Sequence, residues 1–375
     1  MEIFFNRLEQ QLKSQLPFVV YRKPNTINVK TILQKDDALH ITKHFEESGF
    51  VFSPFDDRKN SVLFPLESSE VLSIDGVVSK TVDISRKPII SAQVGTHKAS
   101  KEHHINLVKK GVEAIKNDQF LKVVVSRQEA VTLQNKNPIS IFKNLLANYA
   151  SAFVYCWYHP KVGLWLGATP ETLLKIEGRQ FSIMALAGTQ NYNGTREVIW
   201  KDKELQEQQF VTDFILDNIK STVENIKVSE LETVKAGNLL HLRTQIKGTL
   251  NLQTLKFEAL LRSLHPTPAV CGLPKVAAKE FILKNEDYNR EFYTGFLGEL
   301  NFETDLKPRT GKRNIENRAY TLKRKSTQLY VNLRCVQIKD DKAFIYVGGG
   351  ITETSAPESE WEETVSKSMV IKKVL

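Results

Sequence analysis

Four short apolar segments in close succession constrain this fold more than any other feature of the chain. They span residues 152–159, 163–169, 172–178 and 181–188, and each is rich in aromatic, aliphatic or β-branched residues typical of strands. The connections between them hold only two or three residues. A parallel crossover needs a dozen or more residues, so we predict that the four segments form an antiparallel meander.

The remaining segments alternate between groups of strands and single helices. The apolar spacing predicts helices near residues 1–15, 103–118, 141–150, 203–228, 254–285 (two helices) and 357–371, and further strands near 121–131, 239–250, 329–338 and 342–351. Strands grouped in this way, with helices between the groups, indicate an α+β fold of large sheets covered by helices. The chain has no internal repeat and no low-complexity linker, so we predict a single domain over residues 1–375.

The net charge of +9 raises the possibility of an anionic partner such as nucleic acid. Much of the excess lies in one polar stretch, the basic insertion at 302–326, which we interpret as a solvated hairpin or loop rather than a nucleic-acid arm. The N-terminus lacks the features of a signal peptide, and no apolar run is long enough to span a membrane. Three widely spaced cysteines fit a reducing compartment, so we expect a cytoplasmic protein without a membrane partner.

Two predicted helices carry acidic residues at helical spacing. Glu204 and Glu207 share one face of the first, while Glu360, Glu363 and Lys367 share one face of the last. Such pairs are usually solvated surface. The spacing also permits four carboxylates to converge on Mg²⁺, which prefers oxygen ligands.

Three other features are ambiguous when each is read by itself. The glycine run at 348–350 either brings backbone amides close to an anion or forms a bulge at a strand end. Lys122 begins an apolar strand and is either a snorkelling edge residue or a base. Glu171, after Pro170, is either a turn carboxylate or an acid.

Read together, these features resemble the chorismate-utilising enzymes, and among them the isochorismate synthases. The resemblance covers about residues 120–375, whereas about residues 1–100 match only loosely, like the variable N-terminal part of that family. It is carried by nine ordered blocks: KVVVSR (122–127), GATPETLL (167–174), ALAGT (185–189), KELQEQQFVTD (203–213), LHLRT (240–244), LHPTPAVCGLPK (264–275), REFYTG (290–295), NLRC (332–335) and GGGITETSAPESEWEETVSK (348–367).

The resemblance implies two large, mostly antiparallel sheets packed together with helices outside, and an active site between the sheets. It implies that Lys122 is the base that activates water and that Glu171 is the acid that protonates the departing C4 hydroxyl of chorismate. A closed pocket should keep Glu171 protonated. Glu207 and Glu363 would bind Mg²⁺ directly, and Glu204 and Glu360 would hold its waters. The substrate-binding residues implied are Gly188, Thr189, His241, Ala269, Tyr293, Arg334, Gly348, Gly350 and Lys367.

A few positions favour one branch of the family. Relatives that make aminodeoxychorismate carry a lysine nucleophile at the place of Ala187, and anthranilate synthases have threonine for Ala269 and glutamine for Lys122. The chain therefore resembles the water-using isochorismate synthases, which are isomerases, and we expect a monomer without a glutaminase subunit. Salicylate synthase is the alternative within the family. A non-catalytic homologue that binds anions or nucleic acid is the alternative outside it. The sequence does not choose between menaquinone and siderophore biosynthesis.

Overall fold

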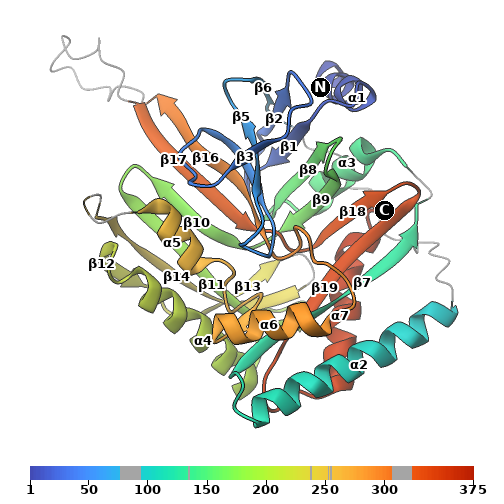
Figure 1. Ribbon diagram of the computed structural model, residues 1–375, viewed down its shortest axis with the longest axis vertical. Coiled ribbons are helices and arrows are strands. Elements are labelled where there is room, and N and C mark those ends of the chain that lie inside the picture. Colours follow the sequence, from blue (N-terminus) through green and yellow to red (C-terminus); the bar gives the residue numbers. More distant parts are fainter. Residues whose placement is uncertain (77–93, 134–135, 237–238, 252, 254–255, 306–322) are drawn as a thin grey trace.

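The computed structural model describes residues 1–76, 94–133, 136–236, 239–251, 253, 256–305 and 323–375. Two large sheets dominate the fold, and every strand pair recorded in them is antiparallel (Figure 1). The first sheet has the order β15 (Gly272–Leu273), β7 (Lys122–Thr132), β19 (Lys342–Ile351), β18 (Cys335–Lys339), β9 (Gly163–Thr169), β8 (Phe153–His159), β1 (Phe18–Arg22), β2 (Val29–Gln34), β6 (Ser69–Ile74).

The second sheet has ten strands in the described part of the chain: nine follow one another along its path, and a tenth pairs with one of them. The order is β12 (Val223–Val228), β14 (Leu239–Leu250), β11 (Gln180–Asn191), β10 (Thr172–Glu177), β17 (Lys323–Val331), β16 (Phe296–Asp305), β4 (Gly49–Ser53), β5 (Ser61–Pro65), β3 (His40–Thr42), and β13 (Glu232–Ala236) pairs with β14. The N-terminal strands are divided between the sheets: β1, β2 and β6 extend the first, and β3 to β5 extend the second.

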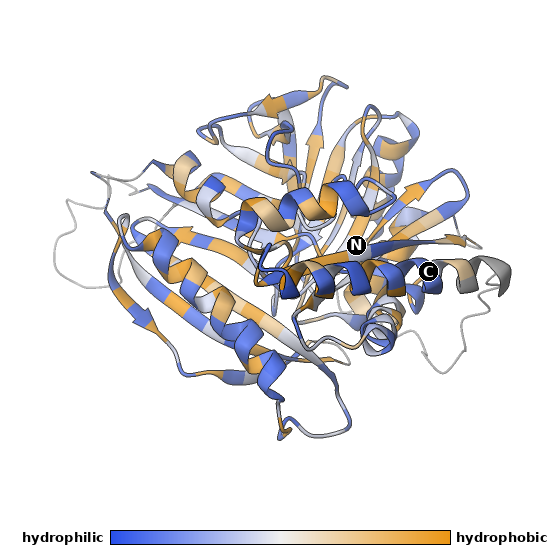
Figure 2. Cartoon of the chain, turned by 60° about the horizontal axis from the view of Figure 1, so that its bottom comes forward, coloured by the Kyte–Doolittle hydropathy of each residue, from blue (hydrophilic) through white to orange (hydrophobic). Residues whose placement is uncertain are grey.

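Helices cover the outer faces of the sheets. They are α1 (Glu2–Lys13), α2 (Val94–Lys116), α3 (Pro138–Asn148), α4 (Asp202–Ile219), α5 (Phe257–Leu264), α6 (Lys275–Asn285) and α7 (Pro357–Lys372). Helix α4 packs against β11 and β14, α7 packs against β19 and α2, and α6 packs against β7. Figure 2 shows hydrophilic and hydrophobic residues mixed along the helices. The predicted α+β fold is confirmed.

An aromatic core joins the two sheets. The first sheet contributes Tyr155, Trp157 and Trp165, and the second contributes Phe52 and Phe64, all of them buried. The stacked rings of Phe64 and Trp157 lie 5.1 Å apart between their centroids. Because aromatic side chains bury large areas, this layer fixes how the two sheets face each other.

The predicted meander is wrong as a single sheet. Strands β8 and β9 pair in the first sheet, whereas β10 and β11 pair in the second, so the chain changes sheets at Pro170–Glu171. Local apolar patterning and a short connection predict strands and exclude a crossover, but they do not specify which neighbour each strand pairs with. The change of sheet places Glu171 between the two layers.

The helix predicted at 203–228 also ends earlier than expected. Helix α4 ends at Ile219, and residues 223–228 form β12, which pairs with β14 from Val223 opposite Leu250. Val223 and Val228 are β-branched, and pairing at the sheet edge overrides the helical spacing that continued into this segment.

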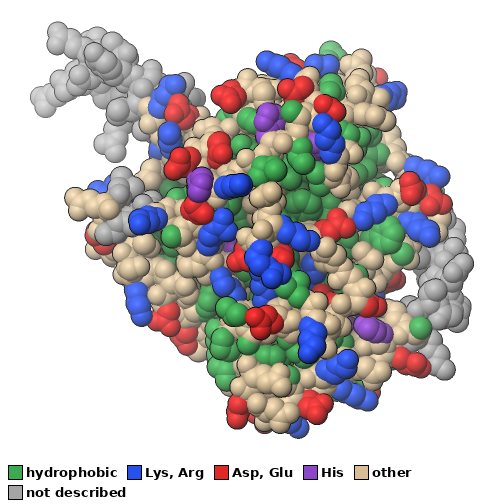
Figure 3. All heavy atoms as spheres, in the orientation of Figure 1, with side chains coloured by type: hydrophobic (Ala, Val, Ile, Leu, Met, Phe, Trp, Pro, Cys, Tyr) green, Lys and Arg blue, Asp and Glu red, His purple; other side chains and the backbone are tan. Residues whose placement is uncertain are grey.

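The basic insertion at 302–326 begins in β16 and ends in β17. Residues 302–305 and 323–326 pair as antiparallel strands, so the predicted hairpin is confirmed at these ends of the insertion, and residues 306–322 lie outside the described residues. On the face in Figure 3, basic and acidic side chains are interspersed rather than separated into patches. No helix in the described part of the chain is long and apolar enough to cross a membrane.

The aromatic core predicts a large cost for truncation at Phe52. This side chain is fully buried and stacks on Phe292 with ring centroids 4.2 Å apart. We expect Phe52→Ala to lower the free energy of unfolding by about 3–5 kcal/mol, measured by urea denaturation. Ile3→Ala, at a side chain that is 87% exposed, should change it by less than about 0.5 kcal/mol. A similar small loss for Phe52→Ala would contradict this account of the core.

Candidate active site

A cavity of about 750 Å³, counting the space at its mouth, lies where the two sheets meet. Most of the predicted site residues line it, although they come from distant parts of the chain. These are Glu171, Gly188, Thr189, Glu207, His241, Ala269, Tyr293, Arg334, Gly348, Gly350, Glu363 and Lys367. Lys122, Glu204 and Glu360 are not among the lining residues.

Lys122 lies directly behind this lining at the start of β7. Its side chain is fully buried, and its Nζ lies 2.8 Å from Oε1 of Glu207. Its Cε lies 3.1 Å from the position that a Cβ at Gly350 would take. The apolar strand buries the stem of the lysine, and the ion pair with Glu207 compensates its charge. Lys122 is therefore a buried cation at the cavity wall, not a snorkelling edge residue.

Glu171 lies where the chain passes from β9 in one sheet to β10 in the other. The residue is only 4% exposed, and Val331 of β17 donates its backbone N–H to the Glu171 carbonyl. Burial raises the pKa of the Glu171 carboxyl to about 8, against the opposing charges of Lys122 and Arg334. At neutral pH this carboxyl is mostly protonated, as expected of a group that has to donate a proton.

The glycine run allows acidic groups from two helices to approach one strand. A Cβ at Gly350 would lie 1.8 Å from Oε1 of Glu207, and one at Gly349 would lie 3.4 Å from Oε2 of Glu360. The ladder between β19 and β7 continues without a register shift through the run. The glycines are therefore not a bulge; they leave room for the carboxylates of α4 and α7.

Lysine side chains balance the three acidic groups. Besides Lys122 and Glu207, Lys203 pairs with Glu360, and Lys367 pairs with Glu363 at 2.5 Å. Burial and the neighbouring Glu363 raise the pKa of Glu360, with Lys203 opposing them. Glu207 is also buried, but Lys122 and Lys203 together lower its pKa. Lys203 was not predicted, because a lysine near a helix N-terminus carries no distinctive sequence signal.

The carboxylate of Glu204 binds a backbone N–H, whereas those of Glu207, Glu360 and Glu363 pair with lysines. Its Oε2 accepts a hydrogen bond from the backbone N–H of Lys201, which caps the start of α4. The Cβ of Glu204 lies beside Gly188, so the residue lies next to the lining of the cavity.

The acidic groups supply suitable donors for a hard cation. Oε2 of Glu360 is buried and accepts no hydrogen bond within the described structure. Carboxylate oxygens are the donors that Mg²⁺ prefers. In the arrangement described here, no three acidic, histidine or cysteine side chains form a metal cage, because ammonium groups lie among the carboxylates. The donor chemistry fits Mg²⁺ if the flexible lysine stems give way to it.

A hydrogen-bonded chain of Gly188, His241 and Arg334 forms another wall. Nδ1 of His241 donates to the Gly188 carbonyl at 2.7 Å, so Nε2 is left to accept a hydrogen bond from Nη2 of Arg334. Burial and Arg334 hold the pKa of His241 well below 6.5, which keeps this neutral tautomer. Burial lowers the pKa of Arg334 to about 10, so it stays charged at neutral pH.

A backbone irregularity directs Gly188 and Thr189 toward the cavity. The β11–β14 register shifts between Ala187 and Gln190, and Gly188 has a φ of +69°, where glycine is favoured. With Arg334 and Lys367, this wall offers cations, a hydroxyl and backbone N–H groups. Such a set suits a ligand that carries carboxylates.

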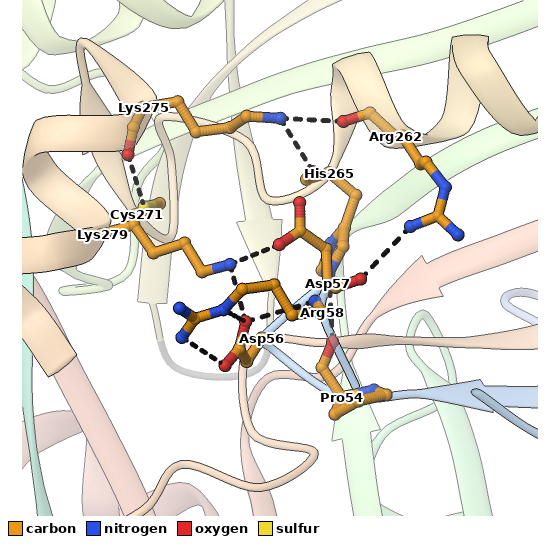
Figure 4. A network of polar contacts seen from close by, with 9 residues as sticks. All are labelled: Pro54, Asp56, Asp57, Arg58, Arg262, His265, Cys271, Lys275 and Lys279. Atoms are coloured by element: carbon orange, nitrogen blue, oxygen red, sulfur yellow. Dashed lines mark hydrogen bonds and ion pairs between the residues drawn. The ribbon is translucent and has the colours of Figure 1, made fainter. Parts of the chain in front are cut away.

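Tyr293 and Ala269 complete the cavity from two loop segments. Tyr293 stacks on Tyr346, with centroids 5.4 Å apart and an interplanar angle of 20°. Ala269 lies in the connection between α5 and α6, whose outer side is held by the polar network in Figure 4. There Lys275 donates to the carbonyls of Arg262 and His265.

The raised pKa of Glu171 predicts a pH-dependent stability change in Glu171→Gln. Between pH 4.5 and about 8 the unfolded chain releases this proton while the folded chain keeps it, so the stability of the parent protein falls with rising pH. Neutral glutamine removes that loss. We expect Glu171→Gln to gain roughly 3–5 kcal/mol relative to the parent protein between pH 4.5 and 8, measured by urea denaturation.

Glu177→Gln is the matched control at the other end of β10. Its carboxylate is 42% exposed and its pKa is lowered by Lys175, so this variant should show no such gain. A Glu171→Gln variant whose stability parallels the parent at every pH would show that the carboxyl is not held protonated.

Comparison with known proteins connects this site to a family. Residues 70–306 match a family model described as "Chorismate binding enzyme", and residues 319–373 match a second model with that description. Anthranilate synthase component 1 of Acetivibrio thermocellus is 27% identical over 299 residues, covering 75% of this chain and 54% of the relative. An isochorismate synthase of Pasteurella multocida is 27% identical over 290 residues, covering 73% of this chain and 61% of the relative.

The chain therefore matches between about half and two thirds of the length of these curated relatives. A solved structure of a 2,3-dihydroxybenzoate-specific isochorismate synthase from Bacillus anthracis superimposes with a TM-score of 0.72 at 23% identity, covering 98% of each chain. At that identity the likeness establishes the shared fold.

Proposed function

Because this chain belongs to the chorismate-binding enzyme family, we propose that it is an isochorismate synthase that converts chorismate to isochorismate with Mg²⁺. The observation that carries the proposal is the pair of Lys122 and Glu171. A buried lysine and a buried carboxyl with a pKa near 8 lie at one cavity, close enough to influence each other's charge. They supply a base and an acid for a reaction that needs both.

The proposed chemistry is a substitution with a shift of the ring double bonds. Lys122, once it has given up its own proton and its ion pair with Glu207, takes a proton from a water molecule whose oxygen bonds to C2 of chorismate. The two ring double bonds move, and the C4–oxygen bond breaks. Glu171 gives its proton to the departing hydroxyl, which leaves as water. Each residue thus ends with the proton state opposite to the one in which it began, and solvent restores both.

The remaining walls fit the two carboxylates of chorismate. Arg334 and Lys367 supply positive charge, and Gly188 and Thr189 lie on the irregular part of β11. A neutral His241 orients Arg334 without adding a second charge. A substrate held in this way presents its ring between Lys122 and Glu171.

Glu207 and Glu363 would bind Mg²⁺ directly, and Glu204 and Glu360 would hold its waters. When bound, it would stabilise negative charge that develops on the ring carboxylate. Its approach would have to displace ammonium groups from these carboxylates, because Lys122, Lys203 and Lys367 pair with them.

The relatives include an anthranilate synthase. Enzymes of that kind use ammonia as the nucleophile, whereas the proposed reaction uses water. Two features favour water over ammonia. Lys122 supplies a base that activation of water needs, and Ala269 leaves the adjoining wall small. Salicylate formation would require the same first step followed by loss of pyruvate, so the products distinguish the alternatives.

The direct test is product analysis by chromatography after mixing purified protein with chorismate and Mg²⁺. We expect isochorismate, and we expect turnover to stop after chelation and return when Mg²⁺ is restored. Anthranilate in the presence of ammonium, salicylate as the main product, or no reaction would each reject the proposal. Full turnover after exhaustive chelation would reject the role of the metal.

Loss of either member of the acid–base pair should slow the chemical step. We expect Lys122→Ala and Glu171→Gln each to lower kcat by about 10²–10⁴-fold. Because the two groups act in one event, the double variant should be barely slower than either single variant. Steady-state kinetics measure all three. A Lys122→Ala enzyme that keeps more than about a tenth of kcat, a cost of only about 1.4 kcal/mol, would exclude Lys122 as the base.

Ala269 should contribute to the choice of nucleophile. Ala269→Thr adds bulk at the cavity wall and should lower kcat/KM for isochorismate formation about tenfold, a cost of about 1.4 kcal/mol. Ala277→Thr makes the same change on α6, away from this cavity, and should leave kcat/KM unchanged. Equal kinetics for Ala269→Thr and the parent enzyme would remove this position from the specificity argument.

A further inference from the structure

A buried arginine whose hydrogen-bond donors all have acceptors lies behind the cavity. Arg290 is 3% exposed, and its five N–H donors have five acceptors within hydrogen-bonding distance. Two donors reach Glu286 at 2.8 and 2.6 Å, and the others reach the Val124 carbonyl at 2.7 Å, the Val270 carbonyl at 3.0 Å and Oγ1 of Thr294 at 3.3 Å.

The three acceptors other than Glu286 belong to three separate walls of the cavity. Val124 is in β7, two residues after Lys122. Val270 follows Ala269 in the α5–α6 connection, and Thr294 follows Tyr293. The guanidinium of Arg290 therefore connects the strand that carries Lys122 to the segment that carries Ala269 and to the segment that carries Tyr293.

Glu286 strengthens this connection at the same edge of β7. Its Oε1 accepts hydrogen bonds from both the backbone N–H and the hydroxyl of Ser126, each at 2.8 Å. The ion pair between Arg290 and Glu286 is buried, with both side chains 2% exposed. Breaking such a pair is costly, so the arrangement holds its geometry.

We propose that Arg290 is a positioning residue that sets the separation between Lys122 and the wall containing Ala269. This inference rests on the proposed function. The backbone contacts agree with it: Val124 donates to the Cys271 carbonyl, and Leu121 donates to the Leu273 carbonyl, each at 2.7 Å. Lys275 and His265 hold other parts of this segment (Figure 4), whereas Arg290 holds Val270, which lines the cavity.

The test is Arg290→Lys, which keeps the charge but has three donors on a flexible stem in place of a planar set of five. Since Arg334 and Lys367 are on other elements, chorismate binding should persist. We expect kcat to fall at least tenfold while KM for chorismate stays within about threefold of the parent value. Hydrogen exchange should accelerate in peptides covering 121–126, 268–273 and 292–296.

Arg22→Lys is the matched control. Arg22 is also a buried arginine that donates to backbone carbonyls, those of Leu146 and Tyr149, but it does not line the cavity. Its variant should lose stability but keep kcat, and exchange should accelerate near 146–149 instead. If both variants lose kcat in proportion to their stability, or if Arg290→Lys keeps kcat within twofold, the positioning role is rejected.

A second variant, Glu286→Gln, covers the case in which Arg290→Lys does not fold. If Arg290→Lys does not fold, Glu286→Gln retains the shape of the pair without its charge, and should lower kcat in the same direction with KM retained. Unchanged kcat in Glu286→Gln would then reject the proposal. If the parent protein forms no isochorismate, the proposed function fails. Hydrogen exchange in Arg290→Lys then still tests whether Arg290 holds the three segments together, and unchanged exchange in the three peptides would reject that role.

Discussion

The carboxyl of Glu171 is buried where the chain passes from one sheet to the other, and the rest of the site is arranged around that constraint. A carboxylate in this position would be costly, and burial therefore keeps the proton on it at neutral pH. The two sheets that meet at this point bury the Glu171 carboxyl and bring β7, β11 and β19 to one cavity. The passage of the chain between the sheets thus positions Glu171 and also helps to enclose the cavity beside it.

Charge balance is the second requirement of this interior. Three carboxylates lie near Gly349 and Gly350, and three lysines compensate them. The carboxylates can approach the strand because Gly349 and Gly350 have no side chains. A Cβ at Gly350 would occupy the place of the Glu207 carboxylate. The same balanced charges offer oxygen donors to a hard cation and a buried lysine to the substrate. Stability and proposed chemistry thus depend on one set of side chains.

Much of this could be predicted from the sequence, for physical reasons. Strand and helix positions follow from local apolar periodicity, and the fold class follows from how those elements are grouped. The cavity brings together Glu171, His241, Arg334 and the glycine run, which the chain order alone separates widely. Their gathering was predicted from the resemblance to a family rather than from spacing.

The rest depends on tertiary structure that no local pattern records. The change of sheet at Pro170–Glu171 looks like an ordinary short connection, and the end of α4 at Ile219 is decided by pairing of β12 with β14. Lys203 and Arg290 are ordinary charged residues in sequence, and their roles arise only from what lies beside them after folding.

The most direct test of the central claim, that this cavity activates water on one side and protonates a leaving hydroxyl on the other, is turnover of chorismate in water enriched in ¹⁸O. The account predicts isochorismate with one ¹⁸O atom, in the hydroxyl at C2, detected by mass spectrometry and by the isotope shift of the C2 carbon resonance. Isochorismate without the label, which would mean that the original hydroxyl migrates within the molecule, would contradict it.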